Sequence, residues 1–124
     1  MASGITSLKN LGYLYLAFAH LTDEVLEEAE IDSIKERLHR RAPEMSELDL
    51  TKLMANIELW YNNSSENRQE VIRMLVGEIH FEVDDEMVKR SIIEDLESIA
   101  GSDQTISSNE DAFIKNLSSA WGLN

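Results

Sequence analysis

The sequence predicts a single all-α domain of about six helices. Apolar residues recur every three or four positions in six separate stretches, and no stretch shows the two-residue alternation of a strand. One proline and five glycines in 124 residues suit helices joined by short connections. A hydrophobic content of 43% is enough for one core, so residues 1–124 are expected to form one domain.

Three helices are expected in the first half. The first runs from about Ser7 to His20, and its apolar stripe is Leu8, Leu11, Leu14, Tyr15, Phe18 and Leu21. The second ends near Arg41, just before Pro43, and buries Ile31, Ile34 and Leu38. Ser46 is a predicted N-cap for the third, because its side chain can accept a hydrogen bond from a backbone N–H of the first turn. The third helix buries Leu50, Leu53, Met54, Ile57, Trp60 and Tyr61.

Three more helices are expected in the second half. The run Asn62-Asn63-Ser64-Ser65 breaks the apolar pattern and can cap the fourth, which buries Val71, Ile72, Leu75, Val76 and Ile79. Asp84 or Asp85 begins the fifth, which buries Val88, Ile92, Ile93, Leu96 and Ile99. The sixth begins near Ser107 and ends at Gly122, as helices commonly do at glycine. Its buried residues are predicted to be Phe113, Ile114, Leu117, Ala120 and Trp121.

The net charge of -13 narrows the classes of partner. A surface this negative repels nucleic acid and anionic membranes, and it favours cations or a basic protein partner. The absence of cysteine excludes disulfides and thiolate metal sites, and it suits a cytoplasmic protein. The apolar run from Leu11 to Ala19 is interpreted as a core helix, because it is too short to span a bilayer and Lys9 alone precedes it as a cation.

A short motif occurs once in each half. An acidic residue is followed by an aliphatic residue three positions later, a glutamate after seven and an isoleucine after eleven. The two sets are Asp23, Leu26, Glu30 and Ile34, and then Asp103, Ile106, Glu110 and Ile114. Each set joins one predicted helix to the next. The chain is therefore predicted to consist of two pseudo-repeated halves.

The second copy indicates how two carboxylates could meet. Ser107 and Glu110 fit a capping box, in which each side chain accepts the other residue's backbone N–H. Gly101 permits a sharp turn that would bring Asp103 over the start of the last helix. Oxygen ligands without nitrogen or sulfur suit Ca²⁺ or Mg²⁺. A plain alternative stays open, since carboxylates at helix starts are favoured by capping and by the helix dipole.

Other metal patterns fit less well. An EF-hand loop counted from Asp103 would need glycine and glutamate where Ser108 and Ile114 stand. Glu36 and His39 form a single Glu-x-x-His element, whereas a di-iron bundle needs two with two further glutamates. Glu78, His80, Glu82 and Asp84 are interpreted as a solvated helix end, and His20 as a packing residue. No nucleophile motif or phosphate-binding loop is present, so no enzymatic activity is predicted.

The chain resembles the TerB-like family, named for tellurite-resistance protein B. The resemblance extends from Leu11 to Leu123, and the stretch Ile99–Leu123 is the closest part. It implies a helical fold of two similar halves, each with an Asp, an aliphatic residue and a Glu at the spacing above. Family members usually have glycine after the motif Asp, whereas Glu24 and Gln104 stand there in this chain.

The resemblance also implies a function in stress or metal response. Carried over to the matching positions, the ligands of a divalent cation would be Asp23, Glu30, Asp103 and Glu110. The leading prediction is therefore a non-enzymatic cation-binding protein. The alternative is a protein-interaction module whose acidic surface binds a basic partner without metal.

Overall fold

The computed structural model describes residues 8–20, 28–83, 85–101 and 108–123. These residues form six helices: α1 Leu8–His20, α2 Glu28–Arg41, α3 Glu47–Asn63, α4 Arg68–Glu82, α5 Glu86–Gly101 and α6 Ser108–Ala120. No strand occurs in these ranges. The predicted all-α class and the number of helices are confirmed.

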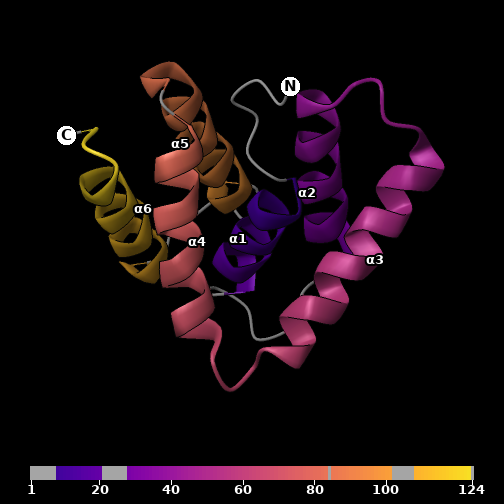
Figure 1. Ribbon diagram of the computed structural model, residues 1–124, viewed down its shortest axis with the longest axis horizontal. Coiled ribbons are helices and arrows are strands. Elements are labelled where there is room, and N and C mark those ends of the chain that lie inside the picture. The colour runs from indigo at the N-terminus through magenta and orange to yellow at the C-terminus, as the bar shows by residue number, and fades with distance from the viewer. Residues whose placement is uncertain (1–7, 21–27, 84, 102–107, 124) are drawn as a thin grey trace.

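The first helix lies at the centre of the molecule. Figure 1 shows α2 and α3 on one side of α1, with α4, α5 and α6 on the other. Helix α1 packs against α2, α3, α4 and α5. All nine residues from Leu11 to Ala19 are buried. The sequence had indicated a one-sided stripe, but a helix that is apolar all round is typical of the interior of a bundle.

The predicted apolar stripes form one core. A single buried cluster draws side chains from all six helices. Burial of large apolar side chains contributes about 25 cal/mol for each Å² removed from water, so this cluster is the main source of stability. One prediction is wrong: Ala120 is exposed rather than buried, because it lines a groove between α4 and α6 that is open to solvent.

Local capping explains most helix ends. Ser46 is the N-cap of α3, and its side chain accepts a hydrogen bond from the Asp49 backbone N–H at 3.1 Å, as predicted. Asp85 caps α5 by accepting from the Met87 N–H at 2.8 Å. The start of α4 differs from the prediction, since Asn67 precedes it without a side-chain cap bond, and Ser64 caps the end of α3 instead.

The last helix ends in a Schellman motif. Gly122 has a φ of 69°, which glycine adopts without steric cost. Its N–H donates to the Ser119 carbonyl at 3.1 Å, and the Leu123 N–H donates to the Ser118 carbonyl at 2.9 Å. The predicted end of the last helix is confirmed. The predicted capping residue at its start, Ser107, lies outside the described residues.

Two helical glycines give a matched test of the core. A Cβ at Gly12 would overlap the Ile57 side chain and lie 3.3 Å from Leu38 Cδ1, whereas a Cβ at Gly77 would meet nothing within 4 Å. We expect Gly12→Ala to lower the free energy of unfolding by about 1–3 kcal/mol through overpacking. We expect Gly77→Ala to raise it by about 0.5–1 kcal/mol, because alanine favours the helix. Urea unfolding of both variants checks this, and equal effects would contradict the close packing at Gly12.

Candidate functional site

Of the four predicted cation ligands, the structure describes the side chain of one, Glu30. Glu30 lies in the first turn of α2 and is only 6% exposed. Glu110 lies in the first turn of α6, and its side chain is outside the described residues. Asp23 and Asp103 also lie outside them. Whether the four carboxylates come together therefore stays a prediction.

The two copies of the motif occupy equivalent helix starts. Glu30 and Glu110 are 80 positions apart, and each is the third residue of its helix in the ranges that the structure describes. Ile34 and Ile114 follow these glutamates by four positions and are both buried. Since residues four apart lie on one face of a helix, each glutamate is expected on the core side of its own helix.

The other acidic groups are not cation sites in the described structure. Within these ranges, no three His, Asp or Glu side chains lie close enough to hold a metal ion. Glu36 pairs with Arg40 at 2.5 Å rather than with His39. Glu78 and Glu82 are exposed, and His80 Nδ1 lies 2.8 Å from Lys89 Nζ, a cation. The interpretation of this group as a solvated helix end is supported, and Asp84 is not described.

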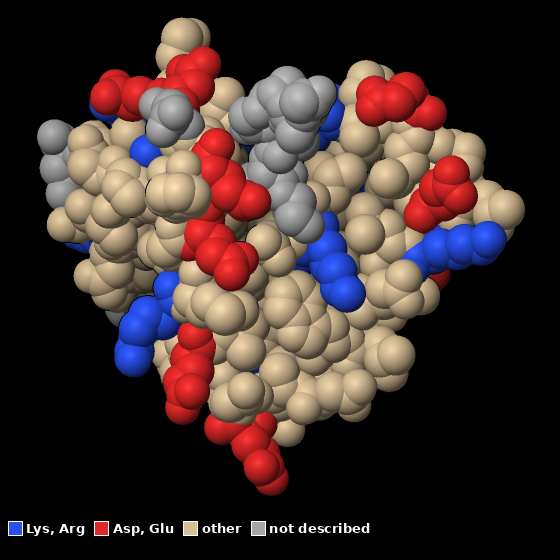
Figure 2. All heavy atoms as spheres, in the orientation of Figure 1, with Lys and Arg blue, Asp and Glu red and all other residues tan. Residues whose placement is uncertain are grey.

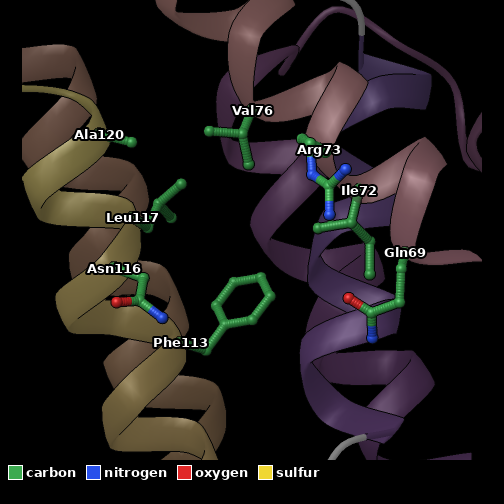
Figure 3. A pocket seen from close by; sticks show the side chains of 8 residues that line it. All are labelled: Gln69, Ile72, Arg73, Val76, Phe113, Asn116, Leu117 and Ala120. Atoms are coloured by element: carbon green, nitrogen blue, oxygen red, sulfur yellow. The ribbon is translucent and has the colours of Figure 1, made fainter.

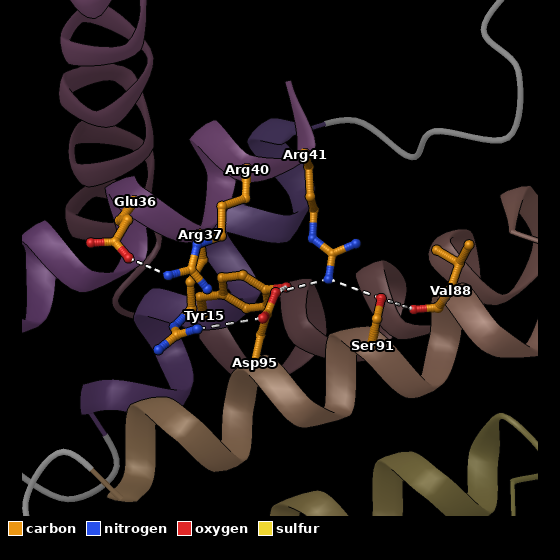
Figure 4. A network of polar contacts seen from close by, with 8 residues as sticks. All are labelled: Tyr15, Glu36, Arg37, Arg40, Arg41, Val88, Ser91 and Asp95. Carbon is orange, nitrogen blue, oxygen red and sulfur yellow. Dashed lines mark hydrogen bonds and ion pairs between the residues drawn. The ribbon is translucent and has the colours of Figure 1, made fainter. Parts of the chain in front are cut away.

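A polar network connects α1, α2 and α5 at the centre of the bundle (Figure 4). Asp95 Oδ2 accepts hydrogen bonds from the Tyr15 hydroxyl at 2.6 Å and from Arg41 Nη2 at 2.8 Å. Arg37 Nη1 lies 3.6 Å from Asp95 Oδ1. Arg41 also donates to Ser91 Oγ at 3.1 Å, and that hydroxyl donates to the Val88 carbonyl at 2.6 Å.

The electrostatics of this network follow from its burial. The side chains of Asp95, Arg37 and Arg41 are between 17% and 19% exposed, so two guanidinium groups share one largely buried carboxylate. Burial raises the pKa of the Tyr15 phenol well above its usual range, and the nearby Asp95 charge adds to this while Arg41 opposes it. The phenol therefore stays protonated and donates to Asp95. The network connects three helices.

A second polar cluster surrounds the end of α1. The Tyr13 hydroxyl forms a short hydrogen bond with Ser64 Oγ, and His20 Nδ1 lies 2.6 Å from the Tyr61 hydroxyl. Arg68 stacks on the Tyr61 ring, with 3.8 Å between Cζ and the ring centroid. The His20 ring also meets the Tyr61 ring edge-on. His20 therefore packs against α3, as the sequence interpretation proposed.

Sequence reasoning missed the central network. It treated Tyr15 only as an apolar residue of the stripe. A signal was present, because a tyrosine inside an uninterrupted apolar run needs a partner for its hydroxyl once buried. The identity of that partner could not be read from the chain, since Asp95 lies 80 positions away.

The visible surface carries many acidic and few basic side chains. Figure 2 shows acidic groups spaced along the face over α4 and at both upper corners. Exposed acids of α4 and α5 include Glu70, Glu78, Glu94 and Glu97. Lys35 beside Glu47, at 2.8 Å, lowers the pKa of that carboxyl. In the described ranges, no helix is long and apolar enough to cross a lipid bilayer.

These features define an acidic, all-helical protein with a buried first helix and carboxylates at two equivalent helix starts. The family model described as tellurite resistance protein TerB matches residues 14–124, which is nearly the whole chain. The chain therefore belongs to the TerB family, and the resemblance proposed from the sequence is confirmed. No curated protein and no solved structure matches it.

The central network gives a second matched test. Asp95→Asn leaves two largely buried guanidinium groups without their counter-charge, and breaking a buried ion pair costs about 3–5 kcal/mol. Asp111→Asn removes the partner of Lys115 in an exposed pair, which should cost at most about 1 kcal/mol. Urea unfolding at neutral pH measures both losses. A loss in Asp95→Asn no larger than that in Asp111→Asn would contradict the role assigned to the network.

Proposed function

We propose that this TerB-family protein binds a divalent cation through the carboxylates at the starts of α2 and α6, without catalysing a reaction. The ligands in this proposal are Asp23 and Glu30 in the first half, and Asp103 and Glu110 in the second. The cation is Ca²⁺ or Mg²⁺, because all the proposed donors are oxygens. Family membership supports a role in the response to stress or to metals.

The burial of Glu30 is the observation that carries the proposal. Acidic residues that only keep a helix soluble lie in water, whereas this carboxylate is 6% exposed. An isolated buried charge is costly, so a buried carboxylate is paired, hydrogen-bonded or bound to a metal. Of the motif side chains proposed as ligands, Glu30 is the one that the structure describes, and its burial fits a carboxylate that binds a group of the chain or a metal.

The crowding of charge around Glu30 gives independent support. Asp23, Glu24, Glu27, Glu28, Glu30 and Asp32 occur within ten residues. Like charges at helical neighbour spacing destabilise a helix by tenths of a kcal/mol per pair. A divalent cation at the start of α2 would offset this repulsion. A bound cation would therefore stabilise the first half by relieving this repulsion, an effect that helix capping alone does not provide.

A second candidate function is a protein-interaction module. It is favoured by the net charge of -13 and by the exposed acids of α4 and α5. In that case a basic segment of another protein would bind the acidic face through long-range attraction. Such binding weakens smoothly as salt screens the charges, whereas a metal site depends on particular side chains.

Thermal unfolding with added cations tests the leading function. After EDTA treatment, we add CaCl₂ or MgCl₂ at constant ionic strength. A cation that binds only the folded state raises stability by about 2.7 kcal/mol at one hundred times its dissociation constant. We expect one ion to raise the unfolding temperature of the wild type. That rise should be reduced in Glu30→Gln and in the double variant Asp103→Asn, Glu110→Gln.

The matched control is Glu94→Gln with Glu97→Gln. Both residues are exposed on α5, and this double variant removes the same charge as the Asp103, Glu110 pair. The control should respond to the ion like the wild type. Equal responses to every divalent ion in all variants would indicate general screening and sink the cation-site proposal. The interaction module would then be tested by binding a lysine-rich peptide over a series of NaCl concentrations.

A further inference from the structure

A groove runs between α4 and α6. Ile72 and Val76 of α4 and Phe113 and Leu117 of α6 form its apolar walls. Figure 3 shows these side chains directed into the space between the two helices. Gln69, Arg73, Asn116 and Ala120 complete the lining, and the cavity volume is about 270 Å³.

The packing of α6 explains why the groove exists. Helix α6 packs mainly on α5, and its C-terminal end is held to α4 by a hydrogen bond from Trp121 Nε1–H to the Val76 carbonyl at 3.1 Å. Near the middle of α6, the Phe113 ring contacts Phe18 of the core, with 5.4 Å between ring centroids. Between these two contacts the walls stay apart. Ala120 is too small to fill the space.

Arg73 differs from every other arginine of the chain. Arg37 and Arg41 lie against Asp95, Arg40 and Arg90 pair with glutamates, and Arg68 donates to the Tyr61 carbonyl. Arg73 forms no hydrogen bond or ion pair with any residue in the described ranges, and it lines the groove. The groove therefore combines apolar walls with one uncompensated cation and two carboxamides. Pockets that bind small molecules typically have this composition.

We propose that this groove binds a small amphipathic monocarboxylate, such as a medium-chain fatty acid or an arylalkanoic acid. The apolar body would lie between Phe113, Leu117, Ile72 and Val76. The carboxylate would pair with Arg73, whose planar guanidinium matches its geometry. A dry cavity of about 150 Å³ holds benzene, so about 270 Å³ accommodates a chain of roughly eight carbons or a ring with a short tail.

The overall negative charge does not exclude an anionic ligand. Exposed charges are screened beyond about 8 Å at physiological ionic strength, so the contact with Arg73 dominates at the groove. The acidic surface lowers the affinity and the rate of binding without removing the local attraction. This inference does not depend on the proposed cation site, because none of the four proposed cation ligands lines the groove.

The experiment is a titration of the full-length, ¹⁵N-labelled chain with sodium octanoate, followed by two-dimensional NMR. We expect saturable shifts of the Trp121 indole N–H and of the Gln69 and Asn116 carboxamides. The variant Arg73→Gln should weaken octanoate binding at least tenfold. The control Arg90→Gln alters an exposed arginine paired with Glu86 and should leave the affinity unchanged.

Two further measurements distinguish the contribution of the apolar walls to binding from that of the Arg73 charge. Octanol has the same chain without the carboxylate, so it should bind more weakly than octanoate and be insensitive to Arg73→Gln. Ala120→Leu, at an exposed position, should fill the groove and weaken both ligands. If that variant does not fold, Arg73→Gln still decides the question. Shifts away from the groove, no saturation, or equal binding of octanoate by wild type and Arg73→Gln would overturn the proposal.

Discussion

The burial of α1 is the constraint on which the rest of the structure depends. Its residues Leu11–Ala19 have no exposed face, so neighbouring helices must cover every side of it. The run also contains the hydroxyl groups of Tyr13 and Tyr15, and a buried hydroxyl without a partner is costly. Ser64 and Asp95 supply those partners from two different elements. Hydrophobic contact and hydrogen bonding thus fix the positions of α3 and α5 around the same helix.

This arrangement separates the interior from the functional surfaces. The Asp95 network lies where three helices meet, and it uses two arginines to compensate one carboxylate. Those contacts join three helices of the bundle. The carboxylates proposed to bind a cation lie instead at the starts of α2 and α6. The α4–α6 groove lies on the side of the last helix where Trp121 is hydrogen-bonded to α4 and Phe113 contacts Phe18.

Much of the fold could be predicted because its signals are local. Apolar periodicity located all six helices, and Ser46, Asp85 and Gly122 marked boundaries through hydrogen bonds within a few residues of each. Periodicity gave a wrong result for Ala120, because a small residue is compatible with either side of a helix. The start of α4 was missed for a related reason, since Asn67 makes no side-chain cap bond that a sequence pattern could indicate.

The candidate site was only partly predictable. The spacing of the motif marked Glu30, and the structure adds that this glutamate is buried. The pairing of Tyr15 with Asp95 and the position of Arg73 in a groove lined by α4 and α6 depend on contacts between distant segments, so no local pattern could indicate them. Family membership is carried by the match over residues 14–124, which defines the fold more closely than the chemistry.

Native-state hydrogen exchange tests the central position of α1 most directly. If α1 is the helix that the others enclose, its amides open only when the whole protein unfolds, so their opening free energy equals the global free energy of unfolding from urea. The amides of α6, which packs mainly on α5, should open at a lower free energy. The account would be contradicted if the α1 amides exchanged through a local opening whose free energy is lower than that of the α6 opening.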